Sequence, residues 1–381
     1  IIGAAIGQSD FGPTTMVSND AALRIKAAHL GVDAAEHRPT RSNRNRPTVG
    51  WTTIEASHQS IDCLYAAGAI AVDAVVTRVT DDPIEFNDNE FAVLRSGSQS
   101  ALVRAVHGEF VLLSHHTPEA WGLHPRSKEQ RFALELLLDP DIAVIALDGR
   151  AGTGKTILAI AAGLDQVVEQ NRYERLAVYR PLVPVGRADV GFLPGGLDEK
   201  LDPWMAAIHD AVVALTDRGG GSSSNSSNDA RTMVDELTTR GQLSLESVTF
   251  LRGRSLQQQF VVVDEAQNLE PTTLRTILTR VGHGTKVIFT GDTSQIDAPY
   301  LGESNNALSV LASAFAGQSC FGHITLTPAS AATWPASPPS CSESDRQTSP
   351  RQTPIEHRFD IAVIRLQTRL RTFSVKLSGG G

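Results

Sequence analysis

A glycine-rich segment between two apolar segments is the feature that most constrains how this chain can fold. Residues Gly149–Thr156 read GRAGTGKT and match the pattern G-x-x-x-x-G-K-[ST] at every fixed position. The apolar run Ile142–Leu147 precedes the segment, and the helix-prone run Ile157–Val168 follows it. A strand, a glycine loop and a helix in this order predict a phosphate-binding loop in an α/β protein.

Each residue type in this segment has a chemical reason to be there. Glycines let backbone N–H groups turn toward a phosphate that a Cβ would obstruct, and the start of the following helix adds positive potential. We predict that Lys155 reaches the β- and γ-phosphates of ATP and that Thr156 binds Mg²⁺. The other predicted nucleotide-binding residues of the loop are Gly149, Arg150, Ala151, Gly152, Thr153 and Gly154. The alternative is a plain strand-to-helix turn.

Two acidic residues directly follow another apolar run. Phe260–Val263 predicts a buried strand, and Asp264 and Glu265 come immediately after it. In an open parallel sheet, ligands bind at the edge formed by the carboxyl ends of the strands. We therefore expect Asp264 to hold Mg²⁺ and Glu265 to orient or deprotonate the attacking water. Acids that stabilise a helix N-terminus are the alternative.

Two glutamines complete the candidate site. The apolar run Lys286–Phe289 leads to Gln295, whose amide could sense the γ-phosphate and couple hydrolysis to movement. A simple turn would explain the same residues equally well. Gln130 is predicted on the helix before the glycine loop, where its amide could read both edges of adenine. An exposed helical glutamine is the alternative there.

Composition divides the chain into four predicted zones. Residues 1–39 contain a strand candidate at 14–18 and a helix candidate at 20–31, and residues 40–118 are a linker and a small β-rich module. Residues 119–327 alternate strands and helices, and residues 328–381 are expected to be a largely disordered Pro/Ser-rich tail. The apolar runs of the third zone predict a mostly parallel sheet with both faces covered.

Three shorter segments within these zones also carry structural predictions. Residues 91–113 predict a β-meander, and Arg218–Asp229 predicts a low-complexity loop. The linker arginines are expected to form a solvated hinge, with nucleic-acid contact as the alternative. They are Arg38, Arg41, Arg44 and Arg46.

Overall charge and cysteine usage exclude several classes of protein. The formal net charge of −8 excludes a globally basic nucleic-acid coat, although a local basic groove remains compatible with it. The three cysteines are too far apart for a disulfide framework or a metal-binding motif. No apolar run approaches the roughly 20 residues that cross a bilayer. We therefore expect a cytoplasmic protein with no membrane association.

These motifs together resemble the PhoH-like ATPase family, which has a RecA-like core. The resemblance covers about residues 124–327 and includes Arg180-Pro181, Gly191–Gly195, Arg252-Gly-Arg254, DEAQN and GDTSQID. It implies ATP and Mg²⁺ as cofactors and single-stranded RNA as a partner. Arg180, Pro181 and Gly191–Gly195 would lie toward the RNA, or form an ordinary strand-end loop. Arg252 and Arg254 would contact phosphate or a neighbouring subunit, or form surface ion pairs.

The N-terminal zone resembles the C-terminal part of a PIN-type ribonuclease domain. The similar segment is residues 17–27, and Asp20 is its matching metal-binding acid. The resemblance implies a truncated PIN-like α/β remnant with an incomplete metal site, so that nuclease activity of this chain is not expected. A helix cap is the alternative role for Asp20.

The C-terminal zone departs from the family after its last expected strand. His323–Thr327 matches that strand, but Pro328 follows where the resemblance implies an arginine-bearing segment. We therefore expect this chain to bind ATP and to hydrolyse it slowly. Only one RecA-like core is present, so a homo-oligomer, such as a ring, would supply the second wall of the site. An RNA motor, a nucleotide-dependent switch and a metal-dependent ribonuclease with an auxiliary ATPase remain alternatives.

Overall fold

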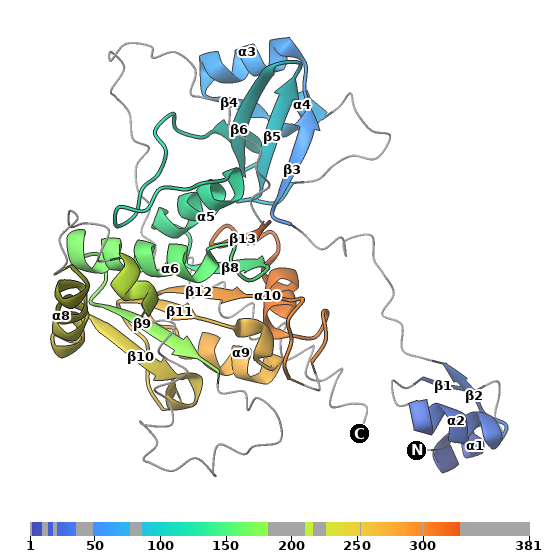
Figure 1. The fold of residues 1–381 in the computed structure, drawn as a ribbon. Helices are drawn as coiled ribbons and strands as arrows, with labels where there is room; N and C mark the ends of the chain where they lie inside the picture. The colour runs from blue at the N-terminus through green and yellow to red at the C-terminus, as the bar shows by residue number, and fades with distance from the viewer. Residues whose placement is uncertain are drawn as a thin grey trace. The chain divides into compact units, whose positions relative to one another are not determined.

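The chain forms two units, Ile1–Thr48 and Val49–Gly381, in the computed structural model (Figure 1). The residues that the structure describes are 2–9, 14–17, 21–35, 49–76, 86–181, 210–215, 226–251, 253–298 and 301–327. Several predictions lie outside these residues and are not tested. They concern Asp20, the linker arginines, Gly191–Gly195, Arg252 and the tail from Pro328.

The first unit is a small strand–helix–strand arrangement with an additional helix. In chain order its elements are α1 (Ile2–Ser9), β1 (Thr15–Val17), α2 (Ala21–His29) and β2 (Asp33–Ala35). β1 and β2 pair in parallel, and Ala27 and Val32 are buried between the elements. β1 therefore lies within the predicted strand at 14–18 and α2 within the predicted helix at 20–31, whereas α1 was not predicted.

A six-stranded, fully parallel sheet is the core of the second unit. In sheet order the strands are β10 (Leu243–Ser247), β9 (Arg175–Arg180), β11 (Gln259–Val263), β12 (Lys286–Gly291), β8 (Val144–Gly149) and β13 (Phe321–Leu326). Every apolar run that predicted a strand forms one. β12 lies between β8 and β11, so the loop after β12 begins between the strand that leads into the glycine loop and the strand that leads into the two acids. This arrangement confirms the predicted α/β core with a mostly parallel sheet.

Helices cover both faces of this sheet (Figure 1). One apolar cluster joins the sheet to α5 (Lys128–Leu138), α6 (Lys155–Leu164) and α8 (Ser226–Thr239). The other joins it to α9 (Pro271–Leu278) and α10 (Ala307–Phe315). The predicted low-complexity loop was wrong at its end, because α8 already begins at Ser226. Polar serine and asparagine residues disguise this helix start, since the apolar residues that pack it come later.

A five-stranded module precedes the parallel sheet in the same unit. Its elements are β3 (Trp51–Glu55), α3 (His58–Ala67), β4 (Ala69–Ala71), α4 (Val72–Val76), β5 (Phe91–Ser96), β6 (Gln99–Val106) and β7 (Glu109–Leu112). The sheet order is β3-β5-β6-β7-β4. The predicted meander is confirmed as the antiparallel strands β5, β6 and β7. α3 was not predicted; Ser57 caps its start and Gly68, with φ +77°, ends it.

The module packs directly on the parallel core. Phe91 stacks on Phe132 of α5 with ring centroids 4.6 Å apart. The side-chain amide of Asn89 donates to the carbonyls of Ser319 and Phe321, which lead into β13. Arg104 forms a 2.7 Å ion pair with Asp139 at the end of α5. α5 is therefore held by the module on one side and by the core on the other.

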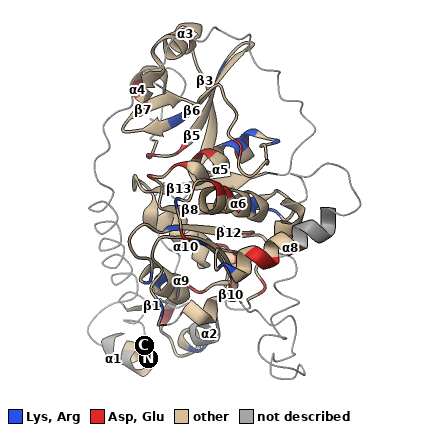
Figure 2. Cartoon of the chain, turned by 90° about the vertical axis from the view of Figure 1, so that its left-hand side faces the viewer, with Lys and Arg blue, Asp and Glu red and all other residues tan. Residues whose placement is uncertain are grey.

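Basic and acidic side chains both occur throughout the part of the chain that the structure describes. Figure 2 shows Lys and Arg interspersed with Asp and Glu along the described chain. Among the helices that the structure describes, none is both long and apolar enough to span a bilayer.

Candidate functional site

The glycine loop has the backbone geometry that its sequence predicts. β8 ends at Gly149 and α6 begins at Lys155. Gly152 and Gly154 have φ values of +80° and +92°, which side-chain-bearing residues adopt only with strain. A Cβ at Gly149 would lie 2.3 Å from the carbonyl oxygen of Leu326 on β13. The glycines therefore allow the loop to turn tightly against its neighbouring strand.

Lys155 lies inside this loop. Its Nζ donates to the carbonyl oxygens of Gly149, at 2.5 Å, and Arg150, at 3.0 Å. Burial lowers the pKa of Lys155, and the carboxylates of Asp292, Glu265, Asp148 and Asp264 act in the opposite direction. A buried cation beside the loop is suited to phosphate oxygens, because little water competes for it.

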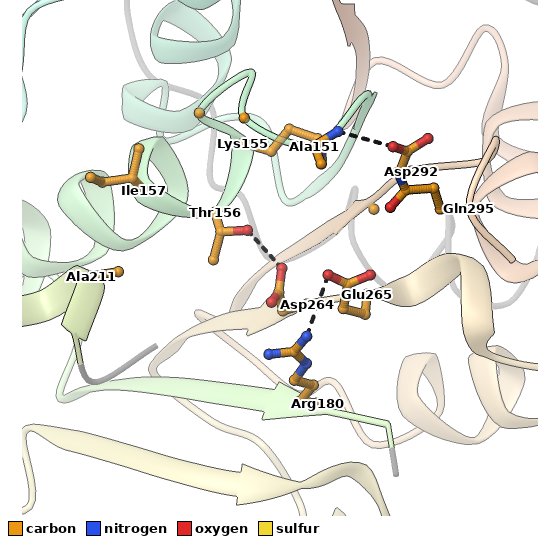
Figure 3. A pocket seen from close by; sticks show the side chains of 13 residues that line it. Ala151, Lys155, Thr156, Ile157, Arg180, Ala211, Asp264, Glu265, Asp292 and Gln295 are labelled. Carbon is orange, nitrogen blue, oxygen red and sulfur yellow. Dashed lines mark hydrogen bonds and ion pairs between the residues drawn. The ribbon is translucent and has the colours of Figure 1, made fainter. Parts of the chain in front are cut away.

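Asp264 and Thr156 meet at the mouth of the loop (Figure 3). The Asp264 carboxylate accepts hydrogen bonds from the hydroxyls of Thr156, at 2.7 Å, and Thr290, at 2.6 Å. A hydroxyl and a carboxylate are suitable Mg²⁺ ligands. Nowhere in the described part of the chain do three or more His, Cys, Asp or Glu side chains form a metal-binding group. The residues fit Mg²⁺ that keeps water and substrate phosphate among its ligands, as this ion usually does.

Glu265 stands on a left-handed turn next to Asp264. Its φ is +54°, and its side chain is 37% exposed. One carboxylate oxygen lies 3.5 Å from the guanidinium of Arg180, the last residue of β9. The other accepts a 2.6 Å hydrogen bond from Gln267. The carboxylate is therefore held from two sides while it faces the cavity.

The loop after β12 carries an acid that the sequence analysis did not select. Asp292 accepts hydrogen bonds from the Ala151 N–H, at 3.0 Å, and from the Ser294 N–H and hydroxyl. Burial raises the pKa of Asp292, but the bonds from Ser294 and Ala151, with Lys155 nearby, outweigh it and lower this pKa below its usual value. An acid at the end of an apolar strand was the signal that identified Asp264, and it would have identified Asp292.

A cavity of about 500 Å³ brings these side chains together (Figure 3). Its lining includes the predicted site residues Ala151, Gly152, Gly154, Lys155, Thr156, Asp264, Glu265 and Gln295, and also Arg180, Gly291 and Asp292. The sequence therefore located most of the wall of the cavity. Gly149, Arg150, Thr153 and Gln130 do not line it.

Two predicted residues make other contacts. The Gln130 side chain donates to the carbonyl of Thr153, at 3.1 Å, and accepts from the N–H of Arg126, at 2.7 Å. It thus holds the glycine loop, and its contact with adenine stays a prediction. Arg254 forms a 2.9 Å ion pair with Glu246, the alternative that the sequence left open.

Comparisons with known proteins agree with the motifs. The family described as "PhoH-like protein" matches residues 122–332. "Protein PhoH2" of Bacillus subtilis is 38% identical over 320 residues, which are 82% of this chain and 69% of that protein. "Protein PhoH2" of Thermobispora bispora is 36% identical over 315 residues, covering 82% and 66%. This chain thus spans about two thirds of the length of these relatives.

Solved structures are similar only at a low level. The Pif1 helicase from Candida albicans has a TM-score of 0.27 and 16% identity over 54% of this chain and 40% of that one. A second solved structure, that of an ATPase domain, has a TM-score of 0.22 and 13% identity, covering 40% and 57%. Scores this low carry no argument about the site.

Proposed function

Because this chain belongs to the PhoH-like family, we propose that it binds ATP with Mg²⁺ and couples ATP hydrolysis to the binding or unwinding of single-stranded RNA. One observation carries the nucleotide part of the proposal. Thr156, in the first turn of α6, and Asp264, directly after β11, meet at 2.7 Å in a cavity that Lys155 also lines. Phosphate-binding and metal-binding groups thus share one wall.

The binding step follows from the loop. Its backbone N–H groups and Lys155 would hold the β- and γ-phosphates, with the start of α6 adding positive potential. Thr156 and Asp264 would hold Mg²⁺, which when bound neutralises charge on the phosphate oxygens. Gln130 would support this step from outside the cavity, because its side chain donates a hydrogen bond to the Thr153 carbonyl and so holds the glycine loop.

The hydrolytic step requires a base near the γ-phosphate. Glu265 is partly exposed to the cavity and has the protonatable oxygens to orient a water molecule. The water oxygen would attack the γ-phosphorus while the bond to the β–γ bridging oxygen breaks, giving ADP and phosphate. The proton of the water passes to Glu265 and then to solvent. Gln295, on the opposite loop, would contact the γ-phosphate.

The RNA part of the proposal is supported by the place of Arg180. This residue ends β9, lines the cavity and pairs with Glu265. An RNA phosphate that attracted the Arg180 guanidinium would weaken this ion pair. The Glu265 carboxylate would then be available to orient the attacking water molecule. We also propose that a homo-oligomer, such as a ring, completes the site, and that the ATPase acts together with a PIN-type nuclease domain.

The proposal is tested by ATP turnover with and without single-stranded RNA. We expect RNA to raise turnover of the unaltered chain, and we expect this stimulation to disappear in Arg180→Gln while ATP binding persists. Arg240→Gln is the matched control, since Arg240 forms an exposed ion pair with Glu236 on α8. Stimulation that survives in Arg180→Gln would contradict the coupling route. If RNA does not change the ATP turnover of the unaltered chain, a nucleotide-dependent switch would instead be favoured.

A further inference from the structure

A buried glutamine connects the two catalytic loops of the site. Gln267 lies in the short 3₁₀ turn Ala266–Asn268 and is 1% exposed. Its Nε2 donates to the Glu265 carboxylate, at 2.6 Å, and to the Gln295 carbonyl, at 3.0 Å. Its Oε1 accepts from the Asp292 N–H, at 3.1 Å. One amide group thus contacts the turn that carries Glu265 and the loop that carries Gln295.

The orientation of this amide is fixed by the chemistry of its partners. The Asp292 N–H can only donate, so it requires the oxygen of the amide. The Glu265 carboxylate and the Gln295 carbonyl accept, so they require the nitrogen. A flipped amide would set donor against donor on one side and oxygen against oxygen on the other. Because the group is buried, such a mismatch would cost the full desolvation penalty of each unpaired atom.

The neighbouring backbone leaves space for this side chain. A Cβ at Gly291, the last residue of β12, would lie 2.3 Å from Oε1 of Gln267 and 2.6 Å from Cδ1 of Leu308 on α10. The backbone φ of Gly291 is not positive, so close packing rather than conformational freedom calls for glycine here. The strand end and the glutamine are therefore packed against each other.

We propose that Gln267 is a positioning residue that sets the place of Glu265 according to the state of the loop after β12. That loop also contacts the glycine loop, because Asp292 accepts a hydrogen bond from the Ala151 N–H. If either loop moved when it contacted the γ-phosphate, the Gln267 side chain would thus move with it and change the position of the Glu265 carboxylate. This inference rests on the proposed ATP hydrolysis, in which Glu265 acts on the water.

The first test separates binding from turnover in the full chain. Gln267→Met keeps a similar length but removes the amide, so we expect turnover to fall on the order of 10-fold or more, within the range for lost electrostatic positioning. We expect the affinity for Mg·ATP to change by less than about three-fold, because Gln267 does not line the nucleotide cavity. Gln267→Leu, which removes both the donor and the acceptor of the amide, should show the same separation.

Gln166→Met is the matched control. Gln166 is 0% exposed, and its Nε2 donates to the carbonyls of Leu137 and Ala162, away from the cavity. Thermal unfolding is measured for each variant. We expect Gln166→Met to lower the unfolding temperature and to keep the turnover of the unaltered chain. A loss of turnover that merely follows the loss of stability in all variants would overturn the inference.

The decisive test is a double-mutant cycle with Glu265→Gln. If Gln267 acts through Glu265, then Gln267→Met should lower the turnover of Glu265→Gln by less than about two-fold, although it impairs the unaltered chain strongly. Losses that multiply, or unchanged turnover in both Gln267 variants, would overturn the inference and leave the proposed function intact. An unaltered chain that binds ATP without any turnover would overturn the proposed function, and this inference with it.

Discussion

A buried lysine lies near each end of the parallel strands, Lys155 at the start of α6 and Lys286 at the start of β12, and the two lysines have different surroundings. Lys155 is 8% exposed and Lys286 is 1% exposed, and each Nζ donates to two main-chain carbonyls. Lys155 lines a cavity that four carboxylates influence. Lys286 instead lies under the end of α5, where its partners are the carbonyls of Leu136 and Asp139.

This difference separates a binding group from a structural one. Burial lowers the pKa of both lysines, so a shifted pKa alone does not identify the site. The Lys286 ammonium satisfies carbonyls at the C-terminal end of a helix, where cations and donors are favourable. Only the Lys155 ammonium can exchange its carbonyl partners for a ligand in an adjoining cavity. Of these two buried lysines, the one that lines a cavity is therefore the one expected to bind a ligand.

The largest effect on ATP turnover is expected when Lys155, the lysine at the cavity, is replaced. Lys155→Ala removes the cation that would contact the phosphates, so we expect ATP turnover to fall by on the order of 10²–10³ or more. The free energy of unfolding should change little, because the desolvation cost of the buried ammonium disappears together with its two hydrogen bonds. Turnover and denaturant unfolding of the same preparation measure both quantities. Undiminished turnover would contradict the assignment of the phosphate loop.

A smaller effect is expected at Lys286, where replacement should lower the stability of the fold and leave ATP turnover nearly unchanged. Lys286→Met leaves the Leu136 and Asp139 carbonyls without their donor, which should lower the free energy of unfolding by about 1–3 kcal/mol at a pH near 10.5, where deprotonation of the lysine on folding costs little. Turnover per folded molecule should stay within about two-fold of the unaltered chain, since Lys286 does not line the cavity. A stable variant that had lost turnover would show that the two ends are not independent.

The pH dependence of stability sharpens the same prediction. Burial lowers the pKa of Lys286 from 10.5 to about 7 in the folded chain. Between these values the unfolded chain binds the proton and the folded chain does not, so the unfolding free energy rises with pH. This group contributes at most about 1.4 kcal/mol per pH unit. Denaturant unfolding at pH 7, 8 and 9 should therefore show a slope that Lys286→Met lacks; parallel profiles would contradict this.

The sequence predicted the parts of the fold that have continuous apolar runs. Val144–Gly149 and Lys286–Gly291 are buried on both faces, so they read as strands without ambiguity. Leu243–Ser247 was missed because it is the edge strand of the sheet and alternates leucines with polar residues. α3 was missed because only Ile61 and Leu64 are buried along it, which is a weak periodic signal.

The site was predictable where its chemistry is local in the sequence. The glycine loop and the Asp264–Glu265 pair each follow an apolar strand, and the cavity brings Lys155, Thr156 and both acids together. Gln267 was not predicted, because a buried amide is selected by partners on a distant loop. Lys286 likewise read as the first residue of a strand, since nothing local indicates which carbonyls it will meet.

The most direct test of the central claim is a paired measurement of ATP binding and phosphate release on the unaltered chain and on Glu265→Gln. The amide keeps the shape of the side chain but accepts a proton poorly. We predict that Glu265→Gln binds Mg·ATP as the unaltered chain does and releases phosphate far more slowly. Phosphate release at the unaltered rate, or loss of ATP binding in a folded variant, would contradict the account of this cavity as an ATP-hydrolysing site.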